Sequence, residues 1–535
     1  MSVSEIPYVD GASQTPAGAL DAQRWRTMAL LALVQFMFAL DTTIVNVALP
    51  TIKHELHFGT SGLAWVVNGY TLVAGGFLIV GGRLADLFGR RRMFITGTIV
   101  FALASGASGL AQSSGMLVAS RFVQGLGEAL AAPAALSLVV LLFQDPKERA
   151  QAIGGWGGIT ILGATLGVVI SGLIVDAISW RWIFLVNLPV AAFVVLFVSR
   201  MIHESRASGR PRIDVLGAVL VTGGLTLLVD GFLNASSHHW GSSAVIAPLA
   251  AGIALLVTFA ASQVAVRQPL VPLRFFANRT RVSANVATIF GSGAFLGMFF
   301  TVTLYMQNDL HYSPLKAGLA WGPFGLALLV GIATSTQLLP RIGVKNGLAF
   351  SFTVSSIGLF LLSRIGPHAD YLGVLLPGML IMAFGQGITF PGVQTSGLQG
   401  LGRGDAGLGA AVQNTSLQVG GSLGLAVLVT VAVRHTASRL AHGVTPLLAS
   451  SDGYSLAIKI SAAIMLLGAI IVITTFERVD FVPPDQIALD VAEASLGSDG
   501  SGTNPRPAPA SAATLRRGRR RRRDPSSPHR SSPPE

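Results

Sequence analysis

The sequence predicts an all-α integral membrane protein that crosses the bilayer with fourteen helices. Hydrophobic residues make up 51% of its 535 residues and charged residues only 12%, whereas soluble domains contain about 25% charged residues. The mean hydropathy is +0.62. The apolar residues also form long runs that are separated by short, charged segments. Composition and arrangement together indicate the membrane class.

Each apolar run is close to the roughly 20 residues that a helix needs to cross a bilayer. Many of the runs contain glycine or proline, which membrane helices tolerate better than soluble helices do. In chain order, the predicted spans are 27–50, 63–81, 93–112, 116–141, 152–176, 183–201, 213–233, 244–265, 283–307, 317–338, 346–363, 371–392, 407–432 and 455–476.

The basic residues between these spans predict the orientation. With the N-terminus in the cytoplasm, the inner segments before the tail hold nineteen lysines and arginines, and the outer loops hold six. Cytoplasmic loops carry the excess of such residues. We therefore expect a multi-pass protein of the bacterial cell (inner) membrane with both termini in the cytoplasm.

Two short echoes suggest an internal repeat. FGRRR at 88–92 resembles RIGVK at 341–345, and GGWGGITILGATLG at 154–167 resembles AAVQNTSLQVGGSLG at 410–424. Both pairs are eight spans apart, which fits two six-helix bundles with two additional helices between them. The predicted organisation is a cytoplasmic N-terminal segment at 1–26, a first bundle at 27–203, two intervening helices with cytoplasmic loops at 204–282, a second bundle at 283–476 and a disordered cytoplasmic tail at 477–535.

The tail is rich in proline, serine, alanine and glycine, a composition typical of disorder. Its arginine run, RRGRRRRR at 516–523, favours contact with anionic lipid head groups. Nucleic-acid binding and no function at all are the alternatives for this run. We expect no nucleic-acid partner, because most other basic residues lie in short loops instead of on one face.

Several kinds of chemistry have no support in the sequence. The chain has no cysteine, which excludes disulfides and thiol catalysis. His238 and His239 lie in an outer loop without a spaced carboxylate, so we expect no metal site. The phosphate-binding pattern GxxxxGK[ST] is absent, so ATP hydrolysis is not expected.

Three ionisable residues, Asp41, Arg121 and Glu128, stand out deep inside predicted spans, where such residues are costly and usually functional. Asp41 lies about 14 Å from the outer end of its span, and Arg121 about 8 Å from the same surface, at 1.5 Å per residue. Glu128 follows Arg121 by about two helical turns and projects from the same face. We expect the three to line one cavity and to bind protons or a cationic substrate; a static buried ion pair is the alternative.

These residues belong to longer motifs that resemble a known family. GRLADLFGRRR at 82–92 resembles the loop 2–3 signature of the major facilitator superfamily, and RFVQGLGEA at 121–129 its span-four proton-antiporter signature. LDTTIVNVALP at 40–50, WRWIFLVNLP at 180–189 and QPLVPLRFF at 268–276 look like the fourteen-span drug:proton antiporter branch, the EmrB/QacA type. The resemblance covers roughly residues 27–476 and implies a major facilitator fold.

The resemblance also implies a role for the loop between spans two and three. In the family this loop is similar to a latch, so Asp86 and Arg90 would engage the other half when the cavity faces outward. Gly82 and Gly89 would permit the close turn. A solvated loop that only sets the orientation explains the arginines, but leaves Asp86 and the glycines unexplained.

Span five resembles the family's antiporter motif, in which closely spaced small residues let helices approach. Its glycines correspond to Gly154, Gly163, Gly167 and Gly172. Val168 stands where the motif has proline and Ser171 where it has glycine, which puts the expected kink in doubt. Close packing without any role in antiport is the alternative.

The motifs together imply export of amphipathic drugs or antibiotics in exchange for protons, with Arg121 modulating proton release. We expect no enzyme, no cofactor other than the coupling proton, a lipophilic or cationic substrate, membrane lipids as neighbours and a functional monomer. A facilitator or importer of a small metabolite in the same fold is the first alternative. A membrane enzyme or receptor is the second, and would need a catalytic cluster or a sizeable soluble domain.

Overall fold

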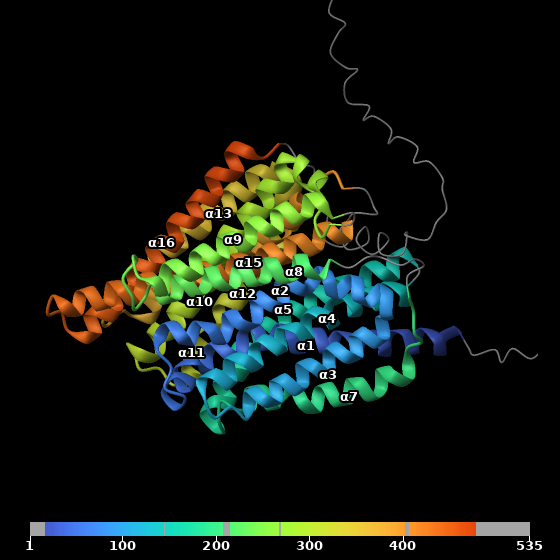
Figure 1. Cartoon of the computed structure of the whole chain (residues 1–535), viewed down its shortest axis with the longest axis horizontal. Coiled ribbons are helices and arrows are strands. Elements are labelled where there is room, and N and C mark those ends of the chain that lie inside the picture. Colours follow the sequence, from blue (N-terminus) through green and yellow to red (C-terminus); the bar gives the residue numbers. More distant parts are fainter. Residues whose placement is uncertain (1–16, 144, 207–213, 267–268, 402–405, 478–535) are drawn as a thin grey trace, which may run out of the picture. The chain divides into compact units, whose positions relative to one another are not determined.

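The computed structural model describes residues 17–143, 145–206, 214–266, 269–401 and 406–477, and these residues are almost entirely helical (Figure 1). The first helices are α1 Ala17–Glu55, α2 Thr60–Phe88, α3 Arg90–Gly109, α4 Ser114–Leu142, α5 Pro146–Ala177, α6 Trp182–Leu185 and α7 Asn187–Met201. Two further helices follow, α8 Val215–Asn234 and α9 Ser243–Ala265. The remaining elements are η1 Leu273–Ala277, α10 Arg279–Asn308, α11 Pro314–Ala320, α12 Gly322–Ile342, α13 Val344–Leu362, η2 Tyr371–Leu375, α14 Leu376–Gly397, α15 Ala406–Ala441 and α16 Pro446–Thr475.

The predicted all-α membrane fold is confirmed, and helix occupies all fourteen predicted spans. Within the described residues, thirteen helical segments are long and apolar enough to cross a membrane. The fourteenth segment, α3, is 20 residues long but begins with three arginines and ends in a run of serine and glycine. These residues lower its hydropathy, although α3 packs against α4 and α7 within the same array.

Side-chain caps explain where several helices begin. The side chains of Ser113, Asp214, Asn278, Ser313 and Asp370 each accept a hydrogen bond from a backbone N–H in the first turn of the following helix. Such a cap satisfies one of the amide groups that a helix start leaves without a partner. The short polar segments between the apolar runs therefore end one helix and start the next.

Glycines set the close packing of the first half, which we define as α1 to α7. A Cβ at Gly97 of α3 would lie 2.6 Å from the Ala131 amide nitrogen of α4, and one at Gly127 would lie 2.5 Å from that of Phe101. Without side chains at these positions the two helix backbones can come into contact. In lipid the hydrophobic effect does not drive helices together, so the dispersion contacts of this close packing stabilise the pair.

The second half, α10 to α16, is packed by the same means. A Cβ at Gly293 of α10 would lie 2.8 Å from the Gly420 carbonyl of α15, and one at Gly358 of α13 would lie 2.8 Å from the Gly378 carbonyl of α14. Figure 1 shows α13, α15 and α16 together in the upper part of the view and the blue to teal helices in the lower part. Because helices of the two halves also touch, all described residues belong to one contact unit, and the predicted domain boundaries stay predictions.

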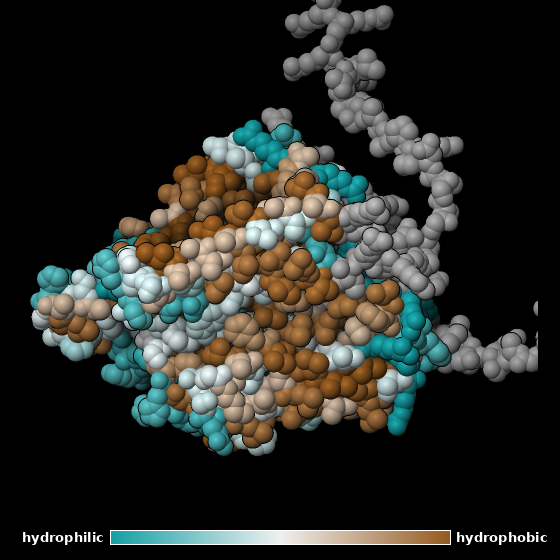
Figure 2. Space-filling model, viewed as in Figure 1, coloured by the Kyte–Doolittle hydropathy of each residue, from teal (hydrophilic) through white to brown (hydrophobic). Residues whose placement is uncertain are grey.

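The two intervening helices pair with each other and touch both halves. A Cβ at Gly252 of α9 would lie 2.8 Å from the Gly224 carbonyl of α8, while α8 also packs on α2 and α15. Most of α9 faces outward, with large exposed side chains at Ile246, Ile253 and Val257. Figure 2 shows such hydrophobic residues over the middle of the helices and hydrophilic ones toward their ends, as a multi-pass membrane protein requires.

The similarity between FGRRR at 88–92 and RIGVK at 341–345 has a structural counterpart. Gly89 joins α2 to α3 with φ of 114°, and Gly343 joins α12 to α13 with φ of 81°. Both values favour glycine, because a Cβ strains this region of the backbone. Each glycine ends one helix and starts the next without an intervening loop.

The ends of the chain differ from the sequence predictions or lie beyond the described residues. The first helix begins at Ala17, within the segment 1–26 that was predicted to precede the spans. The tail after Glu477, with its arginine run at 516–523, lies outside the described residues.

Candidate functional site

Asp41 and Arg121 form an ion pair inside the first half. The two residues are 0% and 1% exposed, and Nη1 of Arg121 donates to Oδ2 of Asp41 at 2.5 Å. Asp41 comes from the middle of α1 and Arg121 from the second turn of α4. A buried charge is stable only when it is paired and its remaining polar atoms are hydrogen-bonded. The stability of this ion pair therefore depends on the further hydrogen bonds of Asp41 and Arg121.

Neutral polar side chains complete the bonding of the pair. Gln124 accepts from Nη1 of Arg121 at 2.8 Å and donates to Oδ1 of Asp41 at 2.8 Å. Nε of Arg121 donates to the Val66 carbonyl of α2 at 2.9 Å. On the other side, Nδ2 of Asn187 lies 3.4 Å from Oδ1 of Asp41 and donates to Ser105 at 3.0 Å. The network thus joins α1, α2, α3, α4 and α7.

Aromatic rings cover the guanidinium of Arg121. Its Cζ lies 4.4 Å from the centroid of the Tyr70 ring and 5.7 Å from that of Phe184. Cation–π attraction strengthens where water is excluded. Packed side chains therefore seal Asp41 and Arg121 from open space in this structure, and the prediction that the three ionisable residues line one cavity stays a prediction.

Glu128 is bonded differently from Asp41. Its Oε2 atom is buried and has no hydrogen-bond partner among the described residues. The carboxyl group lies within electrostatic range of Tyr70, Asp41 and Arg121. The structure therefore brings the three ionisable residues into one neighbourhood, with two of them tightly bonded and the third still holding an unused oxygen.

The sequence contained signals for some of the residues that were missed. Gln124 follows Arg121 by three residues, a spacing that places both on one helix face. Asn187 lies in WRWIFLVNLP, a motif that pointed to the family but gave its asparagine no role. Ser105 gave no signal, because serine is common in membrane helices and its bond to Asn187 depends on tertiary packing.

The turn between α2 and α3 is held by charged side chains. Nη2 and Nε of Arg90 donate to Oδ1 of Asp86 at 2.9 and 3.1 Å. Gly89 supplies the turn with its positive φ. Gly82 does not: it lies seven residues earlier, within α2, where a Cβ would meet only Pro133, at 3.6 Å. The prediction that Gly82 permits the turn is wrong, since the helix continues regularly past it.

Glu204 also holds this turn, and the sequence analysis did not identify it. Its two carboxylate oxygens accept from the backbone N–H groups of Arg91 at 3.1 Å and Arg92 at 3.2 Å. A carboxylate at the start of α3 satisfies free amide groups and complements the helix dipole. A Cβ at Gly89 would meet this carboxyl group at 2.5 Å, so Gly89 makes room for Glu204 as well as for the turn.

Three of the four predicted packing glycines of α5 lie in close contacts. A Cβ at Gly163 would lie 2.8 Å from the Phe36 carbonyl of α1, one at Gly167 would lie 2.9 Å from that of Leu40, and one at Gly172 would lie 2.6 Å from that of Pro314. Gly154 has no atom within 4 Å of the same position. The prediction that Gly154 packs is therefore wrong, because its face of the helix has no neighbour.

Several contacts join the two halves. We call the end of the helices near Arg90, Arg91 and Arg92 the basic end. Gly172 meets Pro314 near the opposite end of α5, and Gln307 of α10 donates to the Val47 carbonyl of α1 at 2.9 Å. Thr71 of α2 and Ser422 of α15 share a hydrogen bond of 2.6 Å between their hydroxyl oxygens. These contacts lie in the middle of the array and at the end away from the basic end.

A family model described as the Major Facilitator Superfamily matches residues 31–425. The chain belongs to this superfamily. Among solved structures with a similar fold is an auto-inhibited peptide transporter of the POT family. It aligns with a TM-score of 0.63 at 15% identity, over 86% of this chain and 99% of the transporter chain. At that identity the likeness supports the shared fold alone.

Curated relatives in the superfamily carry names that refer to antibiotics. The puromycin resistance protein pur8 of Streptomyces alboniger is 36% identical over 88% of this chain and 94% of its own length. The lincomycin resistance protein of Streptomyces lincolnensis is 36% identical over 77% and 85%. The tetracenomycin C resistance and export protein of Streptomyces glaucescens is 31% identical over 80% and 79%.

Proposed function

We propose that this chain exports amphipathic drugs or antibiotics in exchange for protons, by alternating access. One observation carries the proposal: Asp41, Arg121 and Glu128 meet inside an array of membrane-crossing helices. Ionisable groups are costly in a bilayer and usually mark an ion or proton pathway. The superfamily, and the relatives named for puromycin and lincomycin resistance, support a drug-like cargo.

We place the exchanged proton on Glu128. Its Oε2 can take up a proton without breaking an existing hydrogen bond, whereas both oxygens of Asp41 already accept bonds. A cationic substrate is the alternative occupant of the same carboxylate. Arg121 lies within electrostatic range of Glu128. Its positive charge favours the ionised carboxylate, so Arg121 can modulate the release of the proton.

In the proposed transport cycle, the turn at Gly89 and the glycine face of α5 are the segments that move. Asp86 and Arg90 would exchange their mutual bond for partners on the second half when the cavity faces outward. Glu204 keeps the start of α3 in place meanwhile. Gly163, Gly167 and Gly172 let α5 shift against its neighbours without a clash of side chains.

We also propose where the molecule lies and in which orientation. The basic end faces the cytoplasm, and both termini lie on that side of a bacterial inner membrane. The protein works as a monomer among membrane lipids and needs no cofactor other than the coupling proton.

Transport in everted membrane vesicles tests the proposal. Vesicles that contain the chain should accumulate puromycin or ethidium when a proton gradient is imposed, and Glu128→Gln and Asp41→Asn should abolish this accumulation. Glu148→Gln is the matched control, because Glu148 forms a half-exposed pair with Arg24 at 3.5 Å, and such pairs contribute little. Unchanged gradient-driven accumulation in both site variants would contradict the proposal, and accumulation that persists without a gradient would indicate a facilitator.

A further inference from the structure

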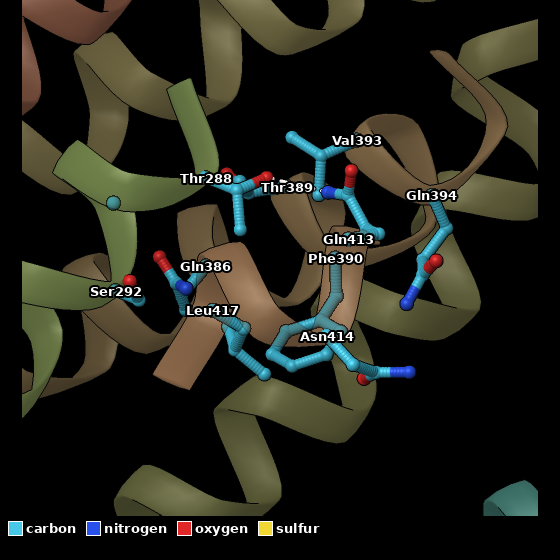
Figure 3. Close-up of a pocket in the computed structure, with 11 residues that line it drawn as sticks. Thr288, Ser292, Gln386, Thr389, Phe390, Val393, Gln394, Gln413, Asn414 and Leu417 are labelled. Atoms are coloured by element: carbon cyan, nitrogen blue, oxygen red, sulfur yellow. Dashed lines mark hydrogen bonds between the residues drawn. The ribbon is translucent and has the colours of Figure 1, made fainter. Parts of the chain in front are cut away.

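A small polar cavity lies in the second half, away from Asp41 and Arg121. It is lined by residues of α10, α14 and α15, and Figure 3 shows their side chains. Its polar lining comes from Thr288, Ser292, Gln386, Thr389, Gln394, Gln413 and Asn414. None of its eleven lining residues is ionisable. The cavity therefore differs in kind from the charged cluster of the first half.

Two buried glutamines in this cavity have unused hydrogen-bonding capacity. Gln386 and Gln413 are 4% and 2% exposed. Nε2 of Gln413 donates to Thr288 at 2.5 Å, but Oε1 of Gln413 and Oε1 of Gln386 have no partner among the described residues. A buried polar atom without a partner is costly, so both amides favour a guest that supplies a bond.

The size and chemistry of the cavity restrict this guest. Its volume of about 20 Å³ accommodates about one water molecule or one small polar group. An amide side chain can turn by 180° and exchange its oxygen and nitrogen, so each glutamine offers either an acceptor or a donor. A hydroxyl group both donates and accepts, and an amide carries both functions, so either group fits both orientations.

The mouth of the cavity lies beside the contact between the two halves. Asn414 and Phe390 are exposed at its rim. Thr415, the residue after Asn414, donates to the Gly75 carbonyl of α2 at 2.9 Å. Thr288 lies about 14 Å along α10 from its first residue, which is well inside the span. A molecule between the halves can therefore reach the cavity from within the membrane.

We propose that this cavity is a subsite that binds an uncharged hydroxyl or amide group of the exported molecule. The inference rests on the proposed export function and deepens it. In the first half, Asp41, Arg121 and Glu128 exchange the proton or bind a cationic group. The second half binds a neutral polar group of the same amphipathic molecule. A single bridging water between Gln386 and Gln413 is the competing occupant.

Direct binding to the purified full chain tests the subsite with two probes. Puromycin carries hydroxyl and amide groups, and tetraphenylphosphonium has no hydrogen-bonding group. Gln386→Leu should weaken puromycin binding about tenfold, the effect of one lost hydrogen bond, and leave tetraphenylphosphonium binding unchanged. Retained tetraphenylphosphonium binding also shows that the variant is folded. Asn346→Leu is the matched control, because Asn346 is an exposed amide on α13 that donates only to the Ile342 carbonyl of its own helix, at 2.9 Å.

The outcomes separate the subsite from the proposed function. Equal binding of puromycin to wild-type and Gln386→Leu protein would overturn the subsite and indicate the bridging water, while leaving gradient-driven export by the wild-type chain intact. Equal loss of both probes would also overturn it, since selectivity for the polar group is what the subsite requires. Wild-type protein that binds neither probe contradicts the subsite together with the export function.

Discussion

At the residue scale, Asp41 illustrates what keeps a charge inside a membrane helix. Its two oxygens receive bonds from Arg121, Gln124 and Asn187, and aromatic rings exclude water from the guanidinium. Each bond offsets part of the desolvation cost of the pair. Glu128 lacks this full set of donors, which is why the two carboxylates receive different roles in the proposed mechanism.

Asp41→Asn should destabilise the protein, because it leaves the charge of Arg121 buried without a counter-charge. We expect a loss of about 3–5 kcal/mol in the free energy of unfolding, typical of a broken buried pair. Thermal and denaturant unfolding in detergent measure it. The double variant Asp41→Asn/Arg121→Gln should recover much of the loss, since no buried charge remains. A single variant as stable as wild type would show that the pair is not maintained.

The carboxyl group of Asp309, just beyond α10, should make the stability of the protein depend on pH. Burial raises the pKa of its carboxyl group, although hydrogen bonds from Ser451 and Ser450 act in the opposite direction. Because the pKa is higher in the folded than in the unfolded state, folding favours the protonated form. Its contribution to stability is present at pH values below the unfolded-state pKa and is lost as pH rises through the folded-state pKa.

Comparing the wild type with Asp309→Asn isolates this contribution. The asparagine keeps an oxygen that can accept from Ser450 and Ser451, but it does not titrate. Unfolding temperatures measured from acidic to neutral pH should therefore fall more steeply, or rise less steeply, for the wild type than for the variant. Parallel profiles for the two proteins would show that the carboxyl group is not perturbed.

At the element scale, α5 shows what a motif in the sequence can predict. The spacing of small residues correctly indicated a packing face, and Gly163 and Gly167 lie against α1. The same pattern included Gly154, which has no neighbour. Spacing reports which residues share a face of a helix, whereas the length over which that face is covered depends on the neighbouring helices.

Gly167→Ala and Gly154→Ala should have opposite effects. A Cβ at Gly167 would collide with Thr43 and the Leu40 carbonyl, so we expect a loss of about 1–3 kcal/mol from overpacking. A Cβ at Gly154 meets nothing within 4 Å, and alanine is favoured over glycine in a helix interior by roughly 0.5–1 kcal/mol. Unfolding temperatures in detergent would distinguish the two, and equal shifts in the same direction would contradict the packing.

At the scale of the whole molecule, hydropathy predicted the spans well and the helix ends poorly. The apolar run at 407–432 lies inside α15, which continues to Ala441. The run at 455–476 lies inside α16, which begins at Pro446, except for its last residue, Phe476. Polar residues extend both helices past the apolar part, and hydropathy is sensitive only to that part. Asp41 and Arg121 could be predicted because charges are rare in such runs, whereas Gln386 and Gln413 could not, because neutral amides are not.

The contact between α2 and α15 allows the two halves to be locked together. Thr71 and Ser422 bring their hydroxyl oxygens to 2.6 Å, and the natural chain has no cysteine to interfere. In the variant Thr71→Cys/Ser422→Cys, a permeant oxidant should form a disulfide and stop puromycin transport, and reduction should restore it. Each single variant is the control. Full transport with the disulfide formed would show that the halves need not separate here.

The exchange of a substrate for a proton on Glu128 is tested most directly by proton release. Puromycin is added to the purified chain in weakly buffered detergent solution, and a pH indicator follows the protons that appear. We expect wild-type protein to release protons in proportion to the puromycin bound, and Glu128→Gln to bind puromycin while releasing none. Equal release by wild type and Glu128→Gln, at equal puromycin bound, would contradict the assignment of the exchanged proton to Glu128.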